Sequence, residues 1–354
     1  MPSDFCAGGS TIRRGTFGCW RSSFCSTSIP STRAHFLPRR FAARTIPWSG
    51  TQSRAASSES NVTLLHDAGP TLGLKEFRLL RDFVNRFCGI YFADDSTYVV
   101  ERRLRERLRQ LGIEDFTEYY RYLRYHPNAD AELEAAAEVL TTNETYFFRE
   151  AYQLRAFTDE ILPVVRGRAL ARGSKRLDVW SAGCSSGEEV YTIAMLIDAS
   201  RLFEGWDVRV FGNDISRRVL RKARGATYSS ASFRAMIPDY ERYFIDTDEG
   251  RQVHPRIRAM CHFGHLNLMN QRRAAIVGRV DVTFCRNVLI YFDDASRRKV
   301  LDTIYERLNR GGYLLLGHSE SLLQSSTAFE IAQLSTDIVY RRPIPYTELP
   351  PRGT

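Results

Sequence analysis

The sequence predicts an α/β protein in two parts, a helical domain followed by a doubly wound domain with a small β-subdomain inserted into it. Two patterns predict this fold. Apolar residues recur at helical spacing over residues 72–150, whereas from about residue 176 short apolar strands alternate with amphipathic helices. Such alternation is typical of a parallel sheet covered by helices. We therefore expect an all-α N-terminal domain over residues 71–150, the α/β domain over 151–345 and a tail over 346–354.

Four helices account for the N-terminal domain. Gly89 and Gly112 follow helical apolar repeats and can end two of them, because glycine adopts the left-handed backbone conformation at little energetic cost. Asp115, with Glu118 three residues later, forms a capping-box pattern that begins the third helix. The expected helices cover about 72–88, 95–111, 115 onward and 129–141.

The strands of the α/β domain stand out as apolar runs that end in polar residues. A helix is expected after each of the first three strands, the first of them over 187–203. Residues 229–270 interrupt the alternation with mixed polar and aromatic sequence, which predicts a small β-subdomain mounted on the sheet. The strands are expected over 176–183, 207–216, 280–292, 311–321 and 337–343.

The formal net charge of +9 belongs mostly to the first 60 residues. They hold eight Arg and only two acids, Asp4 and Glu59, so the rest of the chain carries about +3 and gives no reason to expect nucleic-acid binding. We interpret residues 1–70 as a disordered leader or the product of a wrongly assigned start, although its composition is also that of a transit peptide. No run of 18 apolar residues occurs, so we expect no membrane insertion.

The cysteines argue against a disulfide framework and against a metal. Seven cysteines without a C-x-x-C pair indicate a reducing compartment, and we expect a cytoplasmic, monomeric protein. The nearest approach to a metal-ligand pattern is Cys261-His-Phe-Gly-His265. On a strand, Cys261 and His265 share a face but lie about 13 Å apart, too far to hold one ion. We therefore expect no metal.

The segment WSAGCSSGEEVYTIAML, residues 180–196, places a glycine turn between a strand and a helix, where three kinds of ligand are conceivable. A dinucleotide is the first. Its pyrophosphate would meet Glu188 and Glu189 where it requires bare backbone N–H groups. The spacing also departs from G-x-G-x-x-G, so a dinucleotide is disfavoured.

A serine hydrolase is the second possibility, because Gly183 to Gly187 fits G-x-S-x-G. Ser185 would be the nucleophile and His318 the base, with Asp281 or Asp293 between them in the chain order of α/β-hydrolases. Two features oppose it. Residues 150–180 offer no glycine-rich loop for a second oxyanion donor, and the two glutamates would raise the energy of a developing oxyanion.

A methyl donor such as S-adenosylmethionine is the third possibility and suits the charges best. A carboxylate near the glycine turn suits the donor's ammonium, and Asp214 suits its ribose hydroxyls. Arg149 can pair with its carboxylate through two hydrogen bonds. Because Gly183, Asp214 and Asn287 all fall at carboxyl ends of expected strands, we expect them to meet in one crevice.

Six motifs in order along the chain resemble the chemotaxis receptor methyltransferases, the CheR family, from about Leu72 to Pro343. They are LTTNETYFFRE (140–150), VWSAGCSSGEEVYTIAM (179–195), GNDIS (212–216), LNL (266–268), FCRNVLIYF (284–292) and GGYLLLGHSES (311–321). The resemblance implies a Rossmann-like S-adenosylmethionine-dependent methyltransferase domain. It also implies a protein-glutamate O-methyltransferase that forms methyl esters on cytoplasmic helices of methyl-accepting chemotaxis receptors and releases S-adenosylhomocysteine.

The resemblance also implies which residues act. Arg149 and Tyr291 are implied to position the reacting groups, with Tyr291 close to the transferred methyl. No general base is expected, because a glutamate of pKa near 4.3 is already ionised at neutral pH. Cys184 is expected to pack rather than to react. The residues implied for the donor site are Asn143, Thr145, Arg149, Glu189, Asp214, Asn267, Leu268, Asn287 and Val288.

Recognition of the receptor is expected at the second helix. In VVERRLRERLRQLG (99–112) the arginines form a stripe beside a buried leucine face, and the resemblance implies that this basic helix meets acidic receptor helices. A solvated face is the alternative. The arginines are Arg102, Arg103, Arg105, Arg107 and Arg109.

Two further questions concern the substrate. The family's β-subdomain docks a receptor C-terminal peptide in some members, through a glycine-rich tip. The turn IDTDEGRQ here has only Gly250, so we expect direct engagement of the methylation helices instead. A donor-binding sensor or scaffold that has lost transfer, and a methyltransferase acting on another acceptor, are the alternatives.

Overall fold

A computed structural model describes residues 69–322 and 326–345, which belong to one structural unit. The expected leader, apart from residues 69 and 70, and the expected tail therefore lie outside the described residues. Within the described ranges, no helix is long and apolar enough to cross a bilayer.

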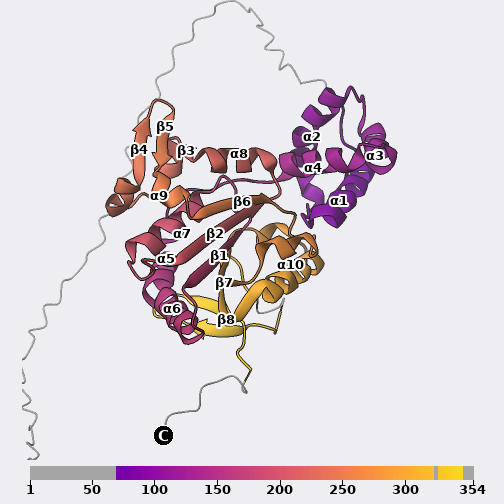
Figure 1. The fold of residues 1–354 in the computed structure, drawn as a ribbon. Coiled ribbons are helices and arrows are strands. Elements are labelled where there is room, and N and C mark those ends of the chain that lie inside the picture. Colours follow the sequence, from indigo (N-terminus) through magenta and orange to yellow (C-terminus); the bar gives the residue numbers. More distant parts are fainter. Residues whose placement is uncertain (1–68, 323–325, 346–354) are drawn as a thin grey trace, which may run out of the picture. The chain divides into compact units, whose positions relative to one another are not determined.

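The N-terminal domain consists of four helices, as the periodicity predicts (Figure 1). Gly89 and Gly112 follow the first two helices with φ of 80° and 67°, which confirms that each ends in a left-handed glycine. The Asp115 side chain accepts a hydrogen bond from the backbone N–H of Glu118 at 2.7 Å, so the third helix begins as expected. The helices are α1 (Leu74–Cys88), α2 (Thr97–Leu111), α3 (Phe116–Tyr125) and α4 (Ala129–Leu140).

The second part is a mostly parallel sheet, whose described strands follow the order β6-β2-β1-β7-β8-β10-β9. All neighbours from β6 to β8 are parallel, whereas β10 is antiparallel to both β8 and β9. The strands are β1 (Arg176–Ala182), β2 (Asp207–Asp214), β6 (Cys261–His265), β7 (Val280–Cys285), β8 (Leu308–Leu316), β9 (Glu330–Gln333) and β10 (Ile338–Arg341).

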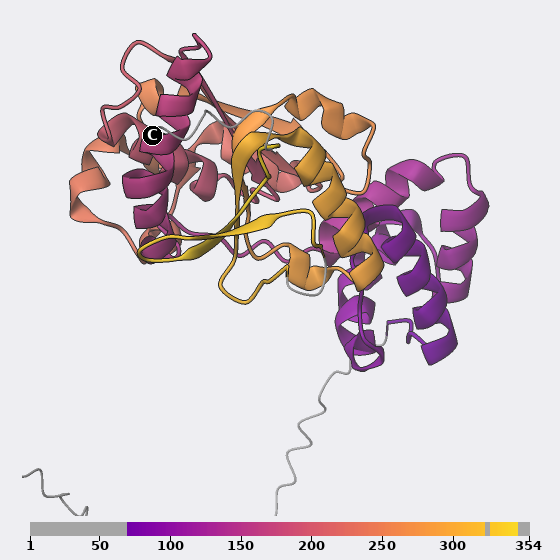
Figure 2. The ribbon, with the colours of Figure 1, turned by 90° about the horizontal axis from the view of Figure 1, so that it is seen from below.

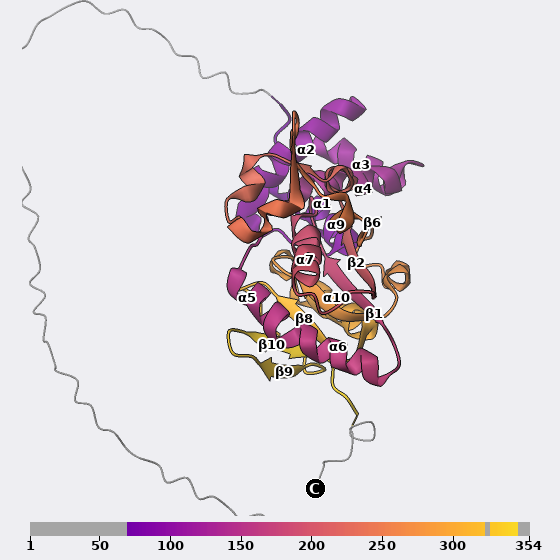
Figure 3. The same cartoon turned by 60° about the vertical axis from the view of Figure 1, so that its left-hand side comes forward.

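Helices cover both faces of this sheet, because its strands alternate apolar side chains between two cores (Figures 2 and 3). In β1, Leu177 and Val179 join the core beneath α5, α6 and α7, whereas Trp180 and Ala182 join the core shared with α10 and the helical domain. A π-helical turn, Phe157–Ile161, connects α5 to α6. The helices are α5 (Ala151–Ala156), α6 (Leu162–Ala171), α7 (Glu188–Ala199), α8 (Arg217–Gly225), α9 (Pro255–Arg258) and α10 (Asp294–Arg307).

The inserted β-subdomain is smaller than the sequence predicts. It is a three-stranded antiparallel sheet of β3 (Thr227–Tyr228), β5 (Gly250–Val253) and β4 (Phe244–Thr247). Strand β6, expected within the 229–270 insertion, instead pairs in parallel with β2 at the edge of the main sheet. Gly264 permits this packing, because a Cβ there would lie 2.7 Å from the Phe211 ring.

The third strand is also shorter than expected. It was expected over 280–292, but β7 ends at Cys285, and Asn287 then adopts a φ of 58°. A left-handed residue breaks strand geometry, so the chain turns and continues as a 3₁₀ turn, Leu289–Tyr291. The end of the FCRNVLIYF motif therefore lies beyond the carboxyl end of β7 and is not part of the strand.

The cap of α3 provides a test of the local structure. Asp115→Ala removes the hydrogen bond to the Glu118 N–H, and we expect a loss of about 1 kcal/mol in the free energy of unfolding. Urea denaturation measures this. Asn128→Ala is the matched control, because the Asn128 side chain makes no capping hydrogen bond to α4. An equal loss in both variants would contradict the assignment.

Candidate functional site

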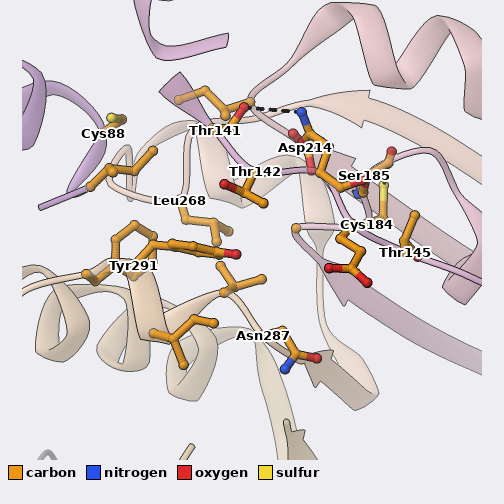
Figure 4. Close-up of a pocket in the computed structure, with 18 of the residues that line it drawn as sticks. Cys88, Thr141, Thr142, Thr145, Cys184, Ser185, Asp214, Leu268, Asn287 and Tyr291 are labelled. Carbon is orange, nitrogen blue, oxygen red and sulfur yellow. Dashed lines mark hydrogen bonds between the residues drawn. The ribbon is translucent and has the colours of Figure 1, made fainter. Parts of the chain in front are cut away.

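A cavity of about 400 Å³ lies at the carboxyl ends of β1, β2 and β7, where open parallel sheets bind ligands. Its walls come from the end of α1, the first half of α2, the segment 140–149, the glycine turn and the loops after β6 and β7. Figure 4 shows Cys88 and Tyr291 on one side of it and Ser185 and Thr145 on the other. All ten residues implied for the donor site or for catalysis line this cavity.

The glycine turn is held by two hydrogen bonds and by a close contact. The backbone N–H groups of Gly183 and Cys184 both donate to the carbonyl oxygen of Asn213, at 2.9 and 2.8 Å. Gly183 has a φ of 80°, and a Cβ there would lie 2.5 Å from Val288. Burial raises the pKa of the Cys184 thiol well above its usual value, so this side chain stays protonated and packs.

Asp214, the last residue of β2, is hydrogen-bonded to the glycine turn. Its carboxylate accepts the backbone N–H groups of Ser185 and Ser216, both at 2.9 Å. Burial raises the pKa of Asp214, while these backbone hydrogen bonds oppose that shift. A carboxylate has further lone pairs beyond those two bonds, and Asp214 lines the cavity, so it can accept hydroxyl groups of a ligand.

Arg286 is the central charge beneath the cavity, with its side chain only 3% exposed. Its guanidinium binds Glu189 at 3.1 Å, Glu150 at 3.1 Å and the carbonyl oxygen of Arg149 at 2.6 Å. Burial raises the pKa of Glu189, and Arg286 together with Ser181 opposes that shift. Arg286 was not among the residues predicted from the sequence, although a charge within the apolar run FCRNVLIYF was a visible signal.

The segment that precedes α5 brings three implied residues to the cavity. Arg149 donates to the carbonyl oxygen of Glu144 at 3.2 Å, and its side chain is 27% exposed. The Asn143 carbonyl oxygen accepts the Ser185 hydroxyl at 3.2 Å, which ties this segment to the glycine turn. Thr145 lines the same wall.

The loops after β6 and β7 supply the remaining implied residues. Asn267 donates from its side chain to the carbonyl oxygen of Phe87 at 2.7 Å, so it binds the end of α1 to the cavity wall. Asn287 Oδ1 is buried and has no hydrogen-bond partner among the described residues. An orphaned acceptor that lines a cavity is a candidate ligand contact, and Leu268 and Val288 add apolar surface beside it.

These groups fit S-adenosylmethionine. Its amino-acid end carries an ammonium and a carboxylate, and the cavity offers Glu189 and the partly exposed guanidinium of Arg149. Asp214 and Asn287 Oδ1 can accept hydrogen bonds from ribose hydroxyls or an amine. Asp214 is buried and the side chain of Glu189 is only 16% exposed, so both favour a ligand that brings a positive charge into the site.

The stripe of arginines on α2 divides into several environments. Arg107 forms two hydrogen bonds with Glu132, and Arg105 pairs with Glu101 at 2.7 Å, so both serve the helical domain itself. Arg109 is 74% exposed beside Glu106, and Arg102 is exposed. Arg103 donates to the Leu140 carbonyl oxygen and lines the cavity.

The groups for a serine hydrolase are not assembled. Ser185 Oγ donates to a backbone carbonyl rather than to an imidazole. Asp281 lies at the opposite end of the sheet, beside Asn309 at 2.9 Å, and Asp293 caps α10. His318 is exposed, with its ring 6.5 Å from that of Tyr152.

The buried carboxylate that follows the glycine turn is also engaged. Glu188 accepts hydrogen bonds from Ser186 and Ser232, both at 2.8 Å, and does not line the cavity, whereas Glu189 and Asp214 do, and these two would face a dinucleotide pyrophosphate. Cys261 and His265 contact different backbone carbonyls, those of Ile257 and Ile215. Over the described ranges, no three His, Cys, Asp or Glu side chains gather as a metal site.

Comparison with known proteins gives consistent matches. The family model "CheR methyltransferase, SAM binding domain" matches residues 143–338, and "CheR methyltransferase, all-alpha domain" matches residues 75–141. Chemotaxis protein methyltransferase 2 of Vibrio cholerae serotype O1 is 36% identical over 76% of this chain and 93% of that protein. Chemotaxis protein methyltransferase 1 of Pseudomonas aeruginosa is 35% identical over 75% and 97% of the respective chains.

The buried ion cluster generates a stability prediction. Arg286→Met leaves Glu189 without its cation and Glu150 with only the 4.0 Å contact to Arg149, and we expect the free energy of unfolding to fall by about 3–5 kcal/mol. Adding Glu189→Gln should recover part of that loss, because a neutral amide is less costly to bury than a carboxylate.

Urea denaturation of these variants checks the prediction, with Arg109→Met as the control. That substitution removes an exposed ion pair and should change stability by less than about 1 kcal/mol. If Arg286→Met were no more costly than the control, the cluster would not stabilise the fold.

Proposed function

The chain belongs to the CheR methyltransferase family, and from this premise we propose that it methylates glutamate side chains of methyl-accepting chemotaxis receptors. S-adenosylmethionine is the donor, and the products are a glutamyl methyl ester and S-adenosylhomocysteine. One observation carries the proposal: the cavity at the sheet edge combines the carboxylates of Asp214 and Glu189, a partly exposed arginine and an orphaned amide oxygen. The relatives matched over most of the chain are chemotaxis protein methyltransferases.

Each donor group is assigned to a residue of the cavity. Glu189 binds the ammonium, Arg149 binds the carboxylate, and Asp214 binds the ribose hydroxyls. Leu268 and Val288 offer apolar surface to the adenine. The remaining donor-site residues of the proposal are Asn143, Thr145, Asn267 and Asn287.

The reaction needs positioning rather than proton transfer. The acceptor glutamate is ionised at neutral pH, so its oxygen attacks the methyl carbon directly while the carbon–sulfur electron pair leaves with the sulfur. Charge is neutralised as the methyl moves, so a dry and aligned site accelerates transfer. Tyr291 and Arg149 orient the groups without exchanging protons.

The acceptor enters from the helical domain. Tyr91, Val99 and Ile290 line the cavity and are each more than one-third exposed, so they form an apolar mouth around it. Arg102 and Arg109 lie on the exposed face of α2, where they attract acidic receptor helices collectively. Arg103, which lines the cavity, acts with them. Arg105 and Arg107 contribute indirectly, through their ion pairs with Glu101 and Glu132 inside the helical domain.

We further propose that the receptor helices are engaged without a tethering peptide. The β4–β5 turn is short, with Thr247 paired to Gly250, and contains that single glycine. The proposal places the reaction in the cytoplasm, carried out by a monomer without a metal.

A transfer assay tests the function. The full-length protein, incubated with methyl-labelled donor and receptor cytoplasmic fragments, should label those fragments, and mild base should release the label as methanol. Binding of the donor with no transfer to any acceptor would instead indicate a sensor or scaffold. Transfer to RNA or a small molecule, but not to receptor fragments, would assign another acceptor.

The α2 surface provides the test of recognition. Combined Arg102→Glu and Arg109→Glu should raise the KM for receptor fragments about tenfold, because each exposed contact contributes at most about 1 kcal/mol. The Kd for the donor should not change. Arg298→Glu with Lys299→Glu, on the exposed face of α10, is the matched control. If the α2 and α10 double variants raised the KM equally, α2 would not be the recognition surface, and the effect would come from the net charge of the protein.

A further inference from the structure

Glu320 makes an unusual set of contacts outside the residues assigned above. It lies in the loop after β8, within the motif GHSES. Its carboxylate accepts four backbone N–H groups, and no arginine or lysine pairs with it among the ion pairs of the described residues. The donors are Gly317 at 2.7 Å, Asn287 at 2.8 Å, Val288 at 2.9 Å and Ile290 at 3.2 Å.

Three of these four donors are remote in the chain. Asn287, Val288 and Ile290 belong to the segment after β7, at least 30 residues before Glu320. One carboxylate therefore fastens the loop after β7 to the loop after β8. Each carboxylate oxygen accepts two backbone N–H groups: Oε1 those of Val288 and Ile290, and Oε2 those of Asn287 and Gly317.

The fastened segment is one that cannot hold its shape by regular secondary structure. Asn287 has a φ of 58°, in the left-handed region that side chains other than glycine occupy at an energetic cost. Its N–H and that of Val288 have left the ladder of β7, which ends at Cys285. Without an acceptor these two partly buried N–H groups would be unpaired, so Glu320 satisfies donors that the strand no longer satisfies.

The opposite loop is shaped for this contact. A Cβ at Gly317 would lie 2.8 Å from the Asn287 backbone nitrogen and 2.9 Å from Glu320 Oε2. The two loops thus approach as closely as glycine allows. Gly317 and Glu320 both lie in the loop after β8, and both contact the loop after β7, which carries the cavity residues.

We propose that Glu320 is a positioning residue for methyl transfer. It holds the backbone of residues 287–291 so that Asn287, Val288 and Tyr291 present their side chains to the cavity. The inference rests on the proposed function, because it assigns Glu320 to the geometry of that reaction. Glu320 itself does not line the cavity, so it acts through the loop.

The variant Glu320→Gln tests this with little change in shape. Its amide group replaces one accepting oxygen by a donor, so one pair of N–H groups loses its partner. We expect kcat per donor-binding site to fall about tenfold or more, with the KM for receptor fragments changed less than about threefold. Hydrogen exchange at the amides of Asn287, Val288 and Ile290 should accelerate at least about tenfold, whereas Leu314 in β8 should not change.

Two further variants complete the design. Gly317→Ala pushes the same loops apart without altering the carboxylate and should reproduce the kinetic and exchange effects. Glu330→Gln is the matched control, because it neutralises an exposed carboxylate of β9 that pairs with Arg341. It should leave kcat and the exchange of the 287–291 amides unchanged.

The outcomes separate this inference from the function. Normal kcat per donor-binding site together with unchanged exchange at residues 287–290 in Glu320→Gln would overturn the proposal. A loss of folded protein with normal kcat in the folded fraction would also overturn it, because the role would then be structural alone. If the wild-type chain transfers no methyl to receptor fragments, the proposed function fails. The role of Glu320 is then tested by hydrogen exchange at residues 287–290 and by the Kd for the donor, both of which Glu320→Gln should raise.

Discussion

The site depends on one buried cation. Arg286 joins three segments that are distant in the sequence: the residues before α5 through Glu150 and the Arg149 carbonyl, the start of α7 through Glu189, and the end of β7 where it resides. A buried charge is tolerated only with its partners in place. The positions of the Arg149 backbone and of the carboxylate after the glycine turn are therefore coupled through a single electrostatic requirement.

The charges around the glycine turn bear on which ligand the cavity favours. Phosphate-binding turns present bare N–H groups at a helix N-terminus. In this chain the corresponding region is acidic, because Asp214 already accepts the Ser185 N–H and the carboxylate of Glu189 lines the same cavity. A phosphate would be repelled, whereas an ammonium and a sulfonium are attracted. The charges around the turn therefore favour a cationic ligand over a phosphate.

Local signals in the sequence predicted much of the fold. The helices of the first domain follow from apolar periodicity, Gly89 and Gly112, since each is determined by a few neighbouring residues. All ten residues that the six motifs imply for the site line one cavity. Two expectations about the sheet were wrong: β6 pairs with β2 at its edge, and β7 ends at Cys285 because Asn287 adopts a left-handed conformation. The pairing of Arg107 with Glu132, 25 residues away, could not be predicted from local patterns. Glu320 was missed because its partners are backbone N–H groups, which have no sequence signature.

The two domains meet at the site itself, and this arrangement suits a reaction without acid–base catalysis. Asn267 binds the carbonyl of Phe87, Asn85 binds Asp293 at 2.8 Å, and Ile90 forms a bridge with Phe292. These contacts fix the end of α1 against the loops that hold the proposed donor contacts. When no proton is transferred, distance and alignment supply the acceleration, so they must be built into the scaffold. Under the proposed function, the helical domain beside the cavity defines the side from which an acceptor carboxylate approaches, past the apolar side chains of Tyr91, Val99 and Ile290.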